Sequence, residues 1–445
     1  MLRSNQTQEE YCKRGFGEME AKGNIKKSIG LPQAVALYIG AVLGSGVLLV
    51  PGLAAEIAGP ASLLAWGLMT LLVLPMALVM GLLSARFPNA GGVAYFVSRA
   101  FNAGAGGLIG WFFLMSVPIG APVAALTGAG YMTVAFGLGE EAKVGIAALM
   151  LAVSLFINYF GMKVAGKIQV AVVLAILLVL ILAGVGAIPD IQAVNFTPFL
   201  PHGWLSVGQA TAILFWCFIG WEAVSHMSEE FVDPQREAIK GVVIAAVVVG
   251  MLYFLTALAT VGTHSYGAST STASLVLVVE RLLGSGGALA IGVTGLFICT
   301  ATIIAYVGAA SRLAYSLANE GRAPQVLSRV SKRYGTPVGG LAFLTACFAF
   351  ILVLYGTGIV SLTTLIQLPN ATFILTYLGG CAAGIRLLRE SRLGMAISRV
   401  SFFLTLLIFP FVGWSVLYPL VIAFVYFLVQ RYGKNTEAES MLIKS

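Results

Sequence analysis

The stretch that decides the fold is residues 206–227, which read SVGQATAILFWCFIGWEAVSHM. It is apolar and long enough to cross a hydrocarbon core about 30 Å thick as a single helix. Two features interrupt it beyond its middle, a glycine at Gly220 and a carboxylate at Glu222. A glycine beside an acid at membrane depth predicts a broken helix that carries a function, because such residues are costly in a plain membrane anchor.

Apolar runs of this kind fill the chain. Of its 445 residues, 59% are hydrophobic and 10% are charged, whereas a soluble domain carries about 25% charged residues. An all-α polytopic membrane protein follows, with twelve predicted transmembrane helices at 31–50, 61–83, 106–134, 144–162, 168–188, 206–227, 238–262, 286–315, 338–355, 361–385, 396–412 and 414–430. Only Gly413 separates the last two runs, and a single long re-entrant hairpin is the alternative there.

Lysine and arginine positions predict the orientation. If the N-terminus lies inside, every Lys and Arg except Lys143 and Arg281 falls in a tail or an even-numbered loop. Because cytoplasmic loops carry the excess of these residues, both termini are expected in the cytoplasm of a cell with this protein in its inner or plasma membrane. The formal net charge of +8 is then a consequence of topology, and no nucleic-acid partner is expected.

A second interruption is predicted in the first helix, at Gly44-Ser45-Gly46. The two breaks fall in the first and sixth runs, which are five helices apart. Since five is odd, two five-helix repeats would run in opposite directions and place equivalent breaks in an inverted repeat. The alternative is that these glycines are close-packing sites, as the spacing from Gly40 to Gly44 allows.

The chemistry of such breaks is specific. An unwound 44–46 segment leaves N–H groups at the positive end of the following half-helix, which suits a carboxylate. The break at 218–221 leaves carbonyl groups at a negative helix end, which suits an ammonium group. Together they match an amino acid in its zwitterionic form.

Glu222 is the acidic residue that lies deepest within any predicted span. A carboxylate there must face a cavity, find a partner or be protonated. Three roles stay open: a structural cap of the broken backbone, a proton-linked or gating group, and direct ligand contact. His226 follows one turn later and is either a proton relay or an interfacial histidine.

Five stretches resemble the amino acid–polyamine–organocation (APC) superfamily. They lie in order along the chain: Gly44-Ser45-Gly46-Val47, the 88–95 segment PNAGGVAY, the 216–222 segment WCFIGWE, the 230–236 segment EFVDPQR, and the 318–324 segment ANEGRAP with Gly335-Thr336-Pro337. Within that superfamily, the residues at 91–97 and 216–218 are most similar to those of the bacterial methionine and branched-chain amino acid exporters.

The resemblance implies a LeuT-like fold, with a 5+5 inverted-repeat core and two additional C-terminal helices. The implied organisation is a cytoplasmic tail at 1–29, one repeat at 30–190, a second at 204–388, two helices at 394–431 and a cytoplasmic tail at 432–445. It also implies an aromatic gate at Trp216 and a pH-response or structural role for Glu222. Some proton-coupled relatives carry a lysine deep in the fifth helix, but here Lys163 and Lys167 precede it, which leaves the coupling ion open.

The substrate is expected to be neutral and hydrophobic (Met, Leu, Ile or Val), because no further intramembrane carboxylate remains to pair a cationic side chain. Besides the breaks, the 116–122, Tyr306 and 367–370 positions are pocket candidates, with helix packing as the alternative for each. The expected substrate-binding residues are Gly44, Ser45, Gly46, Ser116, Trp216, Phe218, Ile219, Gly220, Trp221 and Tyr306, and the expected proton-coupling or gating residues are Glu222 and His226.

The sequence therefore predicts a secondary active amino-acid transporter, in the direction of export, that works by alternating access. An importer or exchanger of different substrate range is the alternative within this class, and a channel or structural subunit outside it. An intramembrane enzyme is not expected, because Glu222 and His226 form the single close pair of reactive groups. No cofactor is expected beyond coupling to protons. Partners are the amino acid and membrane lipid, with a homodimer left open.

Overall fold

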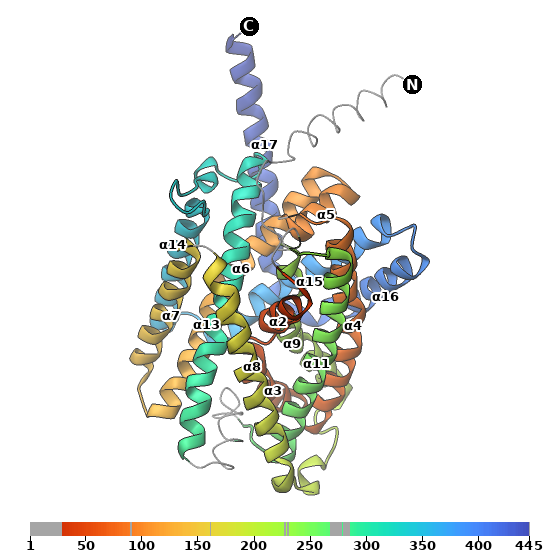
Figure 1. Cartoon of the computed structure of the whole chain (residues 1–445), viewed down its shortest axis with the longest axis vertical. Coiled ribbons are helices and arrows are strands. Elements are labelled where there is room, and N and C mark those ends of the chain that lie inside the picture. Colours follow the sequence, from red (N-terminus) through yellow and green to blue (C-terminus); the bar gives the residue numbers. More distant parts are fainter. Residues whose placement is uncertain are drawn as a thin grey trace.

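The structure is a computed structural model that describes residues 29–444 apart from positions 90, 161, 227, 229, 230, 268–277 and 279–284. Every named element in this part of the chain is a helix, and one isolated bridge pairs Ile29 with Phe231. The helices stand side by side as a bundle (Figure 1). The all-α prediction is confirmed, while Arg281 and nearly all of the predicted N-terminal tail lie outside the described residues.

The helices follow the predicted runs, with breaks and short 3-10 turns between them. The first part of the chain forms α2 (Leu31–Val42), α3 (Ser45–Ala58), η1 (Gly59–Ala61), α4 (Ser62–Arg86), α5 (Gly92–Ala100), α6 (Ala103–Phe136), α7 (Glu140–Phe160), α8 (Met162–Gly186), η2 (Ile188–Asp190) and η3 (Ala193–Phe196). The second part forms α9 (Gly203–Leu214), η4 (Phe215–Phe218), α10 (Trp221–Ser225), α11 (Pro234–Gly262), α13 (Ser285–Asn319), η7 (Gln325–Ser328), α14 (Val338–Gly356), α15 (Leu362–Leu387), α16 (Arg392–Ile408), η8 (Phe409–Val416) and α17 (Leu417–Lys444).

Ten helices within the described ranges are long and apolar enough to cross a membrane, and Leu31–Val42 is a shorter apolar helix. Two of the ten join neighbouring predicted runs, namely Val50–Arg86 and Arg392–Gln430. Inside the second of these, Gly413 has a non-helical backbone with φ of 65°. The chain is a multi-pass membrane protein, and the count of twelve spans stays a prediction.

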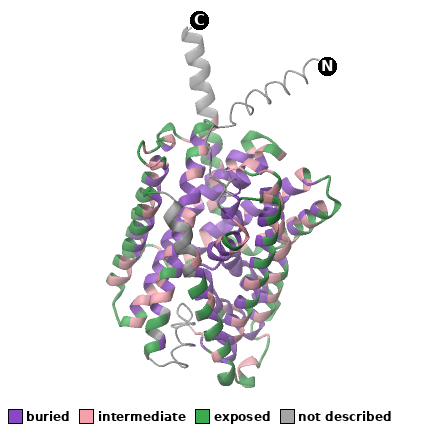
Figure 2. Ribbon diagram, in the orientation of Figure 1, coloured by how far each residue is buried: buried purple, intermediate pink, exposed green. Residues whose placement is uncertain are grey.

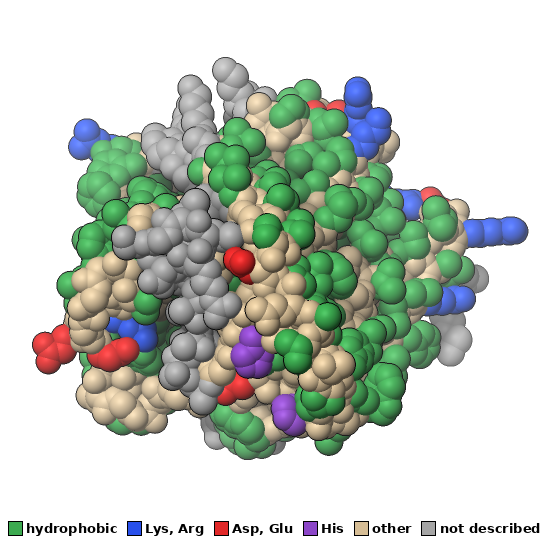
Figure 3. All heavy atoms as spheres, turned by 90° about the horizontal axis from the view of Figure 1, so that it is seen from below, with side chains coloured by type: hydrophobic (Ala, Val, Ile, Leu, Met, Phe, Trp, Pro, Cys, Tyr) green, Lys and Arg blue, Asp and Glu red, His purple; other side chains and the backbone are tan. Residues whose placement is uncertain are grey.

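The surface of the bundle supports this assignment. Buried residues concentrate along its middle, and exposed ones lie on the outer faces of the peripheral helices (Figure 2). Large hydrophobic side chains are among the exposed ones, such as Leu71, Leu174 and Phe424 at 60–70% exposure. Figure 3, seen along the bundle from below, shows hydrophobic side chains over much of the visible face. So large an exposed apolar surface is unfavourable in water but is compatible with contact to lipid chains.

The core is built on two groups of packed helices. On one side α6 runs along α13 and α15, and on the other α11 packs against α4 and α2. α2 lies near the centre of the bundle in Figure 1. We call the face at which α17 ends the proximal face, and the opposite one, which Figure 3 shows, the distal face.

The first predicted break is present. α2 ends at Val42, Leu43 and Gly44 leave the helical path, and α3 starts at Ser45. The break therefore lies slightly earlier than the predicted 44–46 segment, because Ser45 and Gly46 already belong to the first turn of α3. No side chain caps that turn, so its N–H groups stay available.

The second predicted break is also present. α9 tightens into η4, Ile219 is extended with ψ of 142°, and Gly220 has φ of 136° before α10 begins. A residue with a Cβ rarely adopts that φ, so glycine is required at this position. The two interrupted helices thus occur in the predicted places, and the equivalence of the two halves as an inverted repeat stays a prediction.

Candidate functional site

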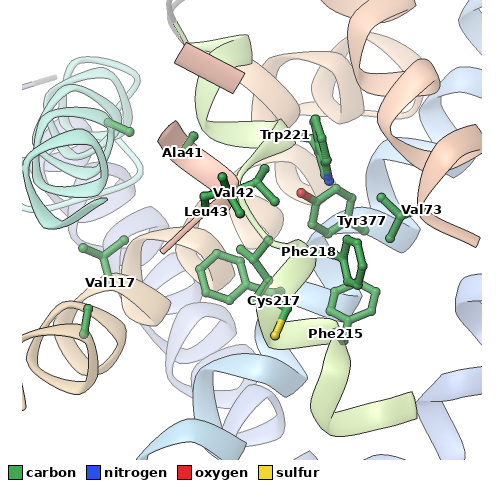
Figure 4. Close-up of a cluster of buried hydrophobic side chains, with 14 of the residues drawn as sticks. Ala41, Val42, Leu43, Val73, Val117, Phe215, Cys217, Phe218, Trp221 and Tyr377 are labelled. Carbon is green, nitrogen blue, oxygen red and sulfur yellow. The ribbon is translucent and has the colours of Figure 1, made fainter. Parts of the chain in front are cut away.

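The two breaks touch each other, and two glycines make that contact. A Cβ added at Gly46 would lie 2.8 Å from Cys217 Cα, and one added at Gly220 would lie 2.6 Å from the Ala41 carbonyl oxygen. Both distances are too short for a real side chain, so the backbones can meet only where a side chain is missing. Figure 4 shows the broken ends around Ala41, Val42 and Cys217.

Tyr253 of α11 fastens the two breaks together. Its hydroxyl lies 2.8 Å from the Val42 carbonyl oxygen and 2.8 Å from the Cys217 carbonyl oxygen. These carbonyls belong to helix ends and have lost their helical donors. One buried hydroxyl therefore serves an end of each interrupted helix. The sequence pattern did not single out Tyr253, because one tyrosine in an apolar run reads as packing.

Glu222 holds the second break from within. Its carboxylate accepts hydrogen bonds from the Gly220 N–H at 2.9 Å, from the Tyr306 hydroxyl at 3.1 Å and from the Tyr377 hydroxyl. The side chain is fully buried, and within the described part of the chain no salt bridge reaches it. Because Tyr306 lies on α13 and Tyr377 on α15, the carboxylate joins α10 to both helices.

A small cavity, which we call the central pocket, lies beside the breaks. Its volume is about 40 Å³, and it is lined by Ala41, Val42, Gly44, Gly46, Val117, Gly120, Ala121, Ala124, Trp216, Ile219, Thr302, Ile303, Tyr306 and Phe373. Ligand pockets usually enclose about 300–1,000 Å³. The walls must therefore move apart before a ligand of amino-acid size can enter.

The central pocket is apolar except at its ends. Thr302 and Tyr306 carry hydroxyls, and no charged side chain is among the described residues that line it. Trp216 carries an indole N–H, and backbone atoms, including those at the start of α3 at Gly44 and Gly46, supply further polar groups. The described residues also contain no group of three or more His, Cys, Asp or Glu side chains that could hold a metal ion.

Part of the predicted site comes together in the central pocket. Gly44, Gly46, Trp216, Ile219 and Tyr306 all line it. Ser45 begins α3 at the same break, but its side chain lies outside the described part of the structure. Gly220 contacts Ala41 just beside the pocket.

Other predicted residues point elsewhere. Phe218 packs against Tyr253 with ring centroids 5.0 Å apart, and Trp221 against Tyr38 at 6.0 Å. The hydroxyl of Ser116 lies 2.6 Å from that of Thr372, between α6 and α15. These side chains pack the surrounding helices, as Figure 4 shows for Phe218 and Trp221. None of the three lines the central pocket, so the prediction of direct substrate contact finds no support at these positions.

His226 lies away from the central pocket as well. A Cβ added at Gly92, the first residue of α5, would lie 2.6–2.8 Å from its ring atoms, and the Phe113 ring is 5.2 Å away. The histidine therefore packs against the turn that precedes α5. The predicted 367–370 segment lies on α15 but lines a different, more distal cavity.

The predicted 116–122 stretch supplies part of the pocket wall, and residues that the sequence did not single out supply another part. Gly120, Ala121 and Ala124 form a small-residue face on α6, and Thr302 and Phe373 close the sides. Gly120 and Ala121 fall within the 116–122 candidate stretch. Thr302 and Phe373 carry no local signal, because only the tertiary packing of α13 and α15 brings them here.

The other motifs hold loops together at the proximal face. The Asn89 side chain accepts a hydrogen bond from the Gly91 N–H at 2.8 Å, and the Asn89 N–H donates to Ser228 at 3.2 Å. Arg322 pairs with Glu320 at 2.8 Å, and its carbonyl accepts from the Trp111 indole at 2.9 Å. These motifs hold the connections between helices together and lie outside the central pocket.

Comparison with known proteins agrees with this arrangement. The family model described as amino acid permease matches residues 29–439. The chain is 36% identical over 410 residues to the uncharacterized amino acid permease YecA of Bacillus subtilis, covering 92% of this chain and 97% of that protein. It is 33% identical over 402 residues to the L-methionine/branched-chain amino acid exporter YjeH of Escherichia coli, covering 89% and 94%. It is 25% identical over 338 residues to the branched-chain amino acid permease BcaP of B. subtilis, covering 71% and 72%.

Substituting Tyr253 with phenylalanine tests the bridge between the breaks. Tyr253→Phe leaves the buried Cys217 carbonyl oxygen without this donor, while the Val42 carbonyl keeps only the Gly44 N–H at 2.8 Å. The free energy of unfolding should therefore fall by about 1–3 kcal/mol. Thermal unfolding of the purified protein measures this. Tyr315→Phe, on the exposed ring of a tyrosine in α13, is the matched control and should unfold like the parent. Equal midpoints for all three proteins would contradict the bridging role.

Proposed function

Because the chain belongs to the amino acid permease family of the APC superfamily, we propose that it is a secondary active transporter of neutral, hydrophobic amino acids that works by alternating access. The observation that carries this proposal is the contact of two broken helices beside an apolar pocket, with no charged side chain among the described residues that line it. The family supports amino-acid transport, and the pocket supports the class of side chain.

The substrate's charged groups would bind backbone at the two breaks. The uncapped N–H groups at the start of α3 are placed for the carboxylate, at the positive end of that helix. Carbonyl oxygens near the ends of α2 and η4 are placed for the ammonium group. The side chain would then face Gly120, Ala124 and Phe373, where burial of methylene groups contributes about 0.8 kcal/mol each.

Methionine, leucine, isoleucine and valine are the proposed substrates, and export is the proposed direction. The name of the E. coli relative supports both, and the name of the BcaP relative supports branched-chain substrates. The proximal face is proposed to be cytoplasmic because of the distribution of Lys and Arg along the chain.

Glu222 is the proposed proton-linked gate. As a carboxylate it accepts three hydrogen bonds, which hold α10 to α13 and α15. A protonated carboxyl is itself a donor, so at least one of these bonds must reverse or be lost. Protonation would thus loosen the joint that closes the pocket toward the proximal face.

Counterflow tests the class of protein. Proteoliposomes loaded with unlabelled leucine should take up labelled leucine or methionine faster than empty ones, because a carrier returns more quickly when it is loaded on both sides. Equal uptake with and without internal leucine would indicate a pore, and chemical conversion of the label would indicate an enzyme. Faster release of preloaded methionine from cells that express the chain, compared with cells that express Gly46→Val, supports export. Slower release contradicts that direction.

Replacing Glu222 with glutamine tests the gate. Glu222→Gln keeps the shape of the side chain but can no longer gain a proton, so exchange should lose its pH dependence and resemble that of the parent at acidic pH. The rate of leucine exchange at several pH values measures this. Glu56→Gln, at an exposed position of α3, is the control and should keep the parent profile. An unchanged profile in Glu222→Gln would leave the carboxylate a structural role alone.

Filling the small-residue face tests how substrate size is read. A Cβ at Gly120 would lie 3.4 Å from Trp216 Cη2, so alanine fits but narrows the pocket. Gly120→Ala should lower exchange of methionine and leucine about tenfold relative to valine, the discrimination expected for about one methylene group. Gly130→Ala on the same helix, which faces Lys143, should leave the ratio unchanged. Equal losses for all three amino acids would show that Gly120 does not read size.

A further inference from the structure

A second cavity lies distal to the central pocket, along α15 and the interrupted helix formed by α9 and η4. It encloses about 270 Å³ and is lined by residues of α9, α15 and η8, together with Ile57 at the end of α3. On α15, Asn370 lies one turn before Phe373, which lines the central pocket. Likewise, Ala212 of α9 lies one turn before Trp216 of η4, which lines the central pocket. The two cavities are therefore stacked, and we call this one the distal cavity.

Three carboxamide side chains line the distal cavity: Gln209, Gln367 and Asn370. The Asn370 amide donates to the Ala212 carbonyl at 2.7 Å, but its own oxygen is buried without a partner among the described residues. The side chains of Gln209, which is exposed, and Gln367, which is half-buried, have no hydrogen-bond partner within the described residues either.

The depth of these groups makes their lack of partners significant. At 1.5 Å per residue, Gln209 lies about 9 Å and Asn370 about 12 Å inward from the distal ends of α9 and α15. That is within the distal half of a hydrocarbon core about 30 Å thick. A carboxamide without a hydrogen-bond partner at such depth is unfavourable. These side chains therefore point to a ligand that supplies hydrogen bonds.

The rest of the lining defines the chemistry of that ligand. No charged side chain is among the described residues that line the cavity, and large apolar ones such as Ile57, Ile213 and Ile366 form its walls. Phe411 and Trp414 of η8 line it too, and both are also exposed on the lipid-facing surface, at 39% and 53%. A ligand can thus place an uncharged head among the amides and leave its chain beside η8.

We propose that the distal cavity binds an uncharged amphiphile from the distal leaflet, with a hydroxyl- or amide-bearing head and an apolar chain. The observation behind it is the buried, unpartnered oxygen of Asn370, which lies with the carboxamides of Gln367 and Gln209 in a cavity whose wall includes the exposed rings of Phe411 and Trp414. This proposal does not depend on which substrate the central pocket binds.

Fluorescence quenching tests this binding with a defined probe. The full-length protein in nanodiscs is titrated with 1-monoacylglycerol whose chain is brominated, because bromine quenches tryptophan on contact. Saturable quenching is expected, and most of it should be lost in Trp414→Phe. The double variant Gln209→Leu/Gln367→Leu should weaken binding about tenfold or more, since two of the three polar partners are gone. Gln192→Leu, which alters a glutamine in the distal loop between η2 and η3, should bind like the parent.

Two further measurements test the alternatives. The stability of the double variant shows whether the amides are structural, and the binding of charged probes shows whether the site prefers an uncharged head. Because Gln209 and Gln367 have no protein partner, the double variant without probe should unfold at or above the parent's temperature. Brominated fatty acid and brominated alkylamine of equal chain length should bind about tenfold more weakly, because a charge is unmatched in the cavity. The proposal is overturned by non-saturable quenching, by unchanged binding in the double variant, by a lowered unfolding temperature, by equal binding of a charged probe, or by displacement of the probe with leucine or methionine.

Discussion

Backbone groups released in the middle of a membrane bundle need partners, and the rest of this structure depends on that constraint. Two helices are interrupted where water is scarce, and each interruption frees carbonyl and N–H groups that lipid cannot satisfy. Two buried side chains supply hydrogen-bond partners for several of these groups. Tyr253 serves a carbonyl from each break, and Glu222 accepts the N–H of Gly220. What remains unpaired at the start of α3 is the part that faces the central pocket.

The same constraint explains why a carboxylate is retained at Glu222. A neutral side chain could cap Gly220, but it would not accept three donors at once from α10, α13 and α15. The joint therefore depends on the charge state of one residue, and its partners are all neutral. In the proposed gate, this joint holds while the carboxyl is ionised and would loosen on protonation, because the direction of hydrogen bonding would then change.

The sequence predicted the breaks because glycine beside polar residues is conspicuous in an apolar run. It predicted Glu222 for the same reason. It could not tell which neighbours of a break face the pocket, since Phe218 and Trp221 belong to the same motif as Trp216 yet pack against Tyr253 and Tyr38.

Tertiary contacts account for the other misses. Thr302 and Phe373 reach the pocket only because α13 and α15 pack against α6, and helical periodicity carries no information on such pairing. The small residues of α6 form a Pro/Gly-rich stretch that is recognisable in the sequence. That pattern is the same whether the residues pack against another helix or line a pocket, so the opposite wall must be known before the two can be distinguished.

The polar groups of the bundle then fall into two kinds, and the difference between them is informative. Around the breaks, Tyr253 bonds to backbone carbonyls, and Glu222 accepts from Tyr377 and the Gly220 N–H, so these side chains need no further ligand. In the distal cavity, Asn370 is buried with an oxygen that has no partner among the described residues, and the half-buried Gln367 and the exposed Gln209 keep unused hydrogen-bonding capacity beside it. Unused capacity at the start of α3 is matched by the charged end of a proposed substrate, and by the same argument unused capacity in the distal cavity requires a second molecule whose head is neutral.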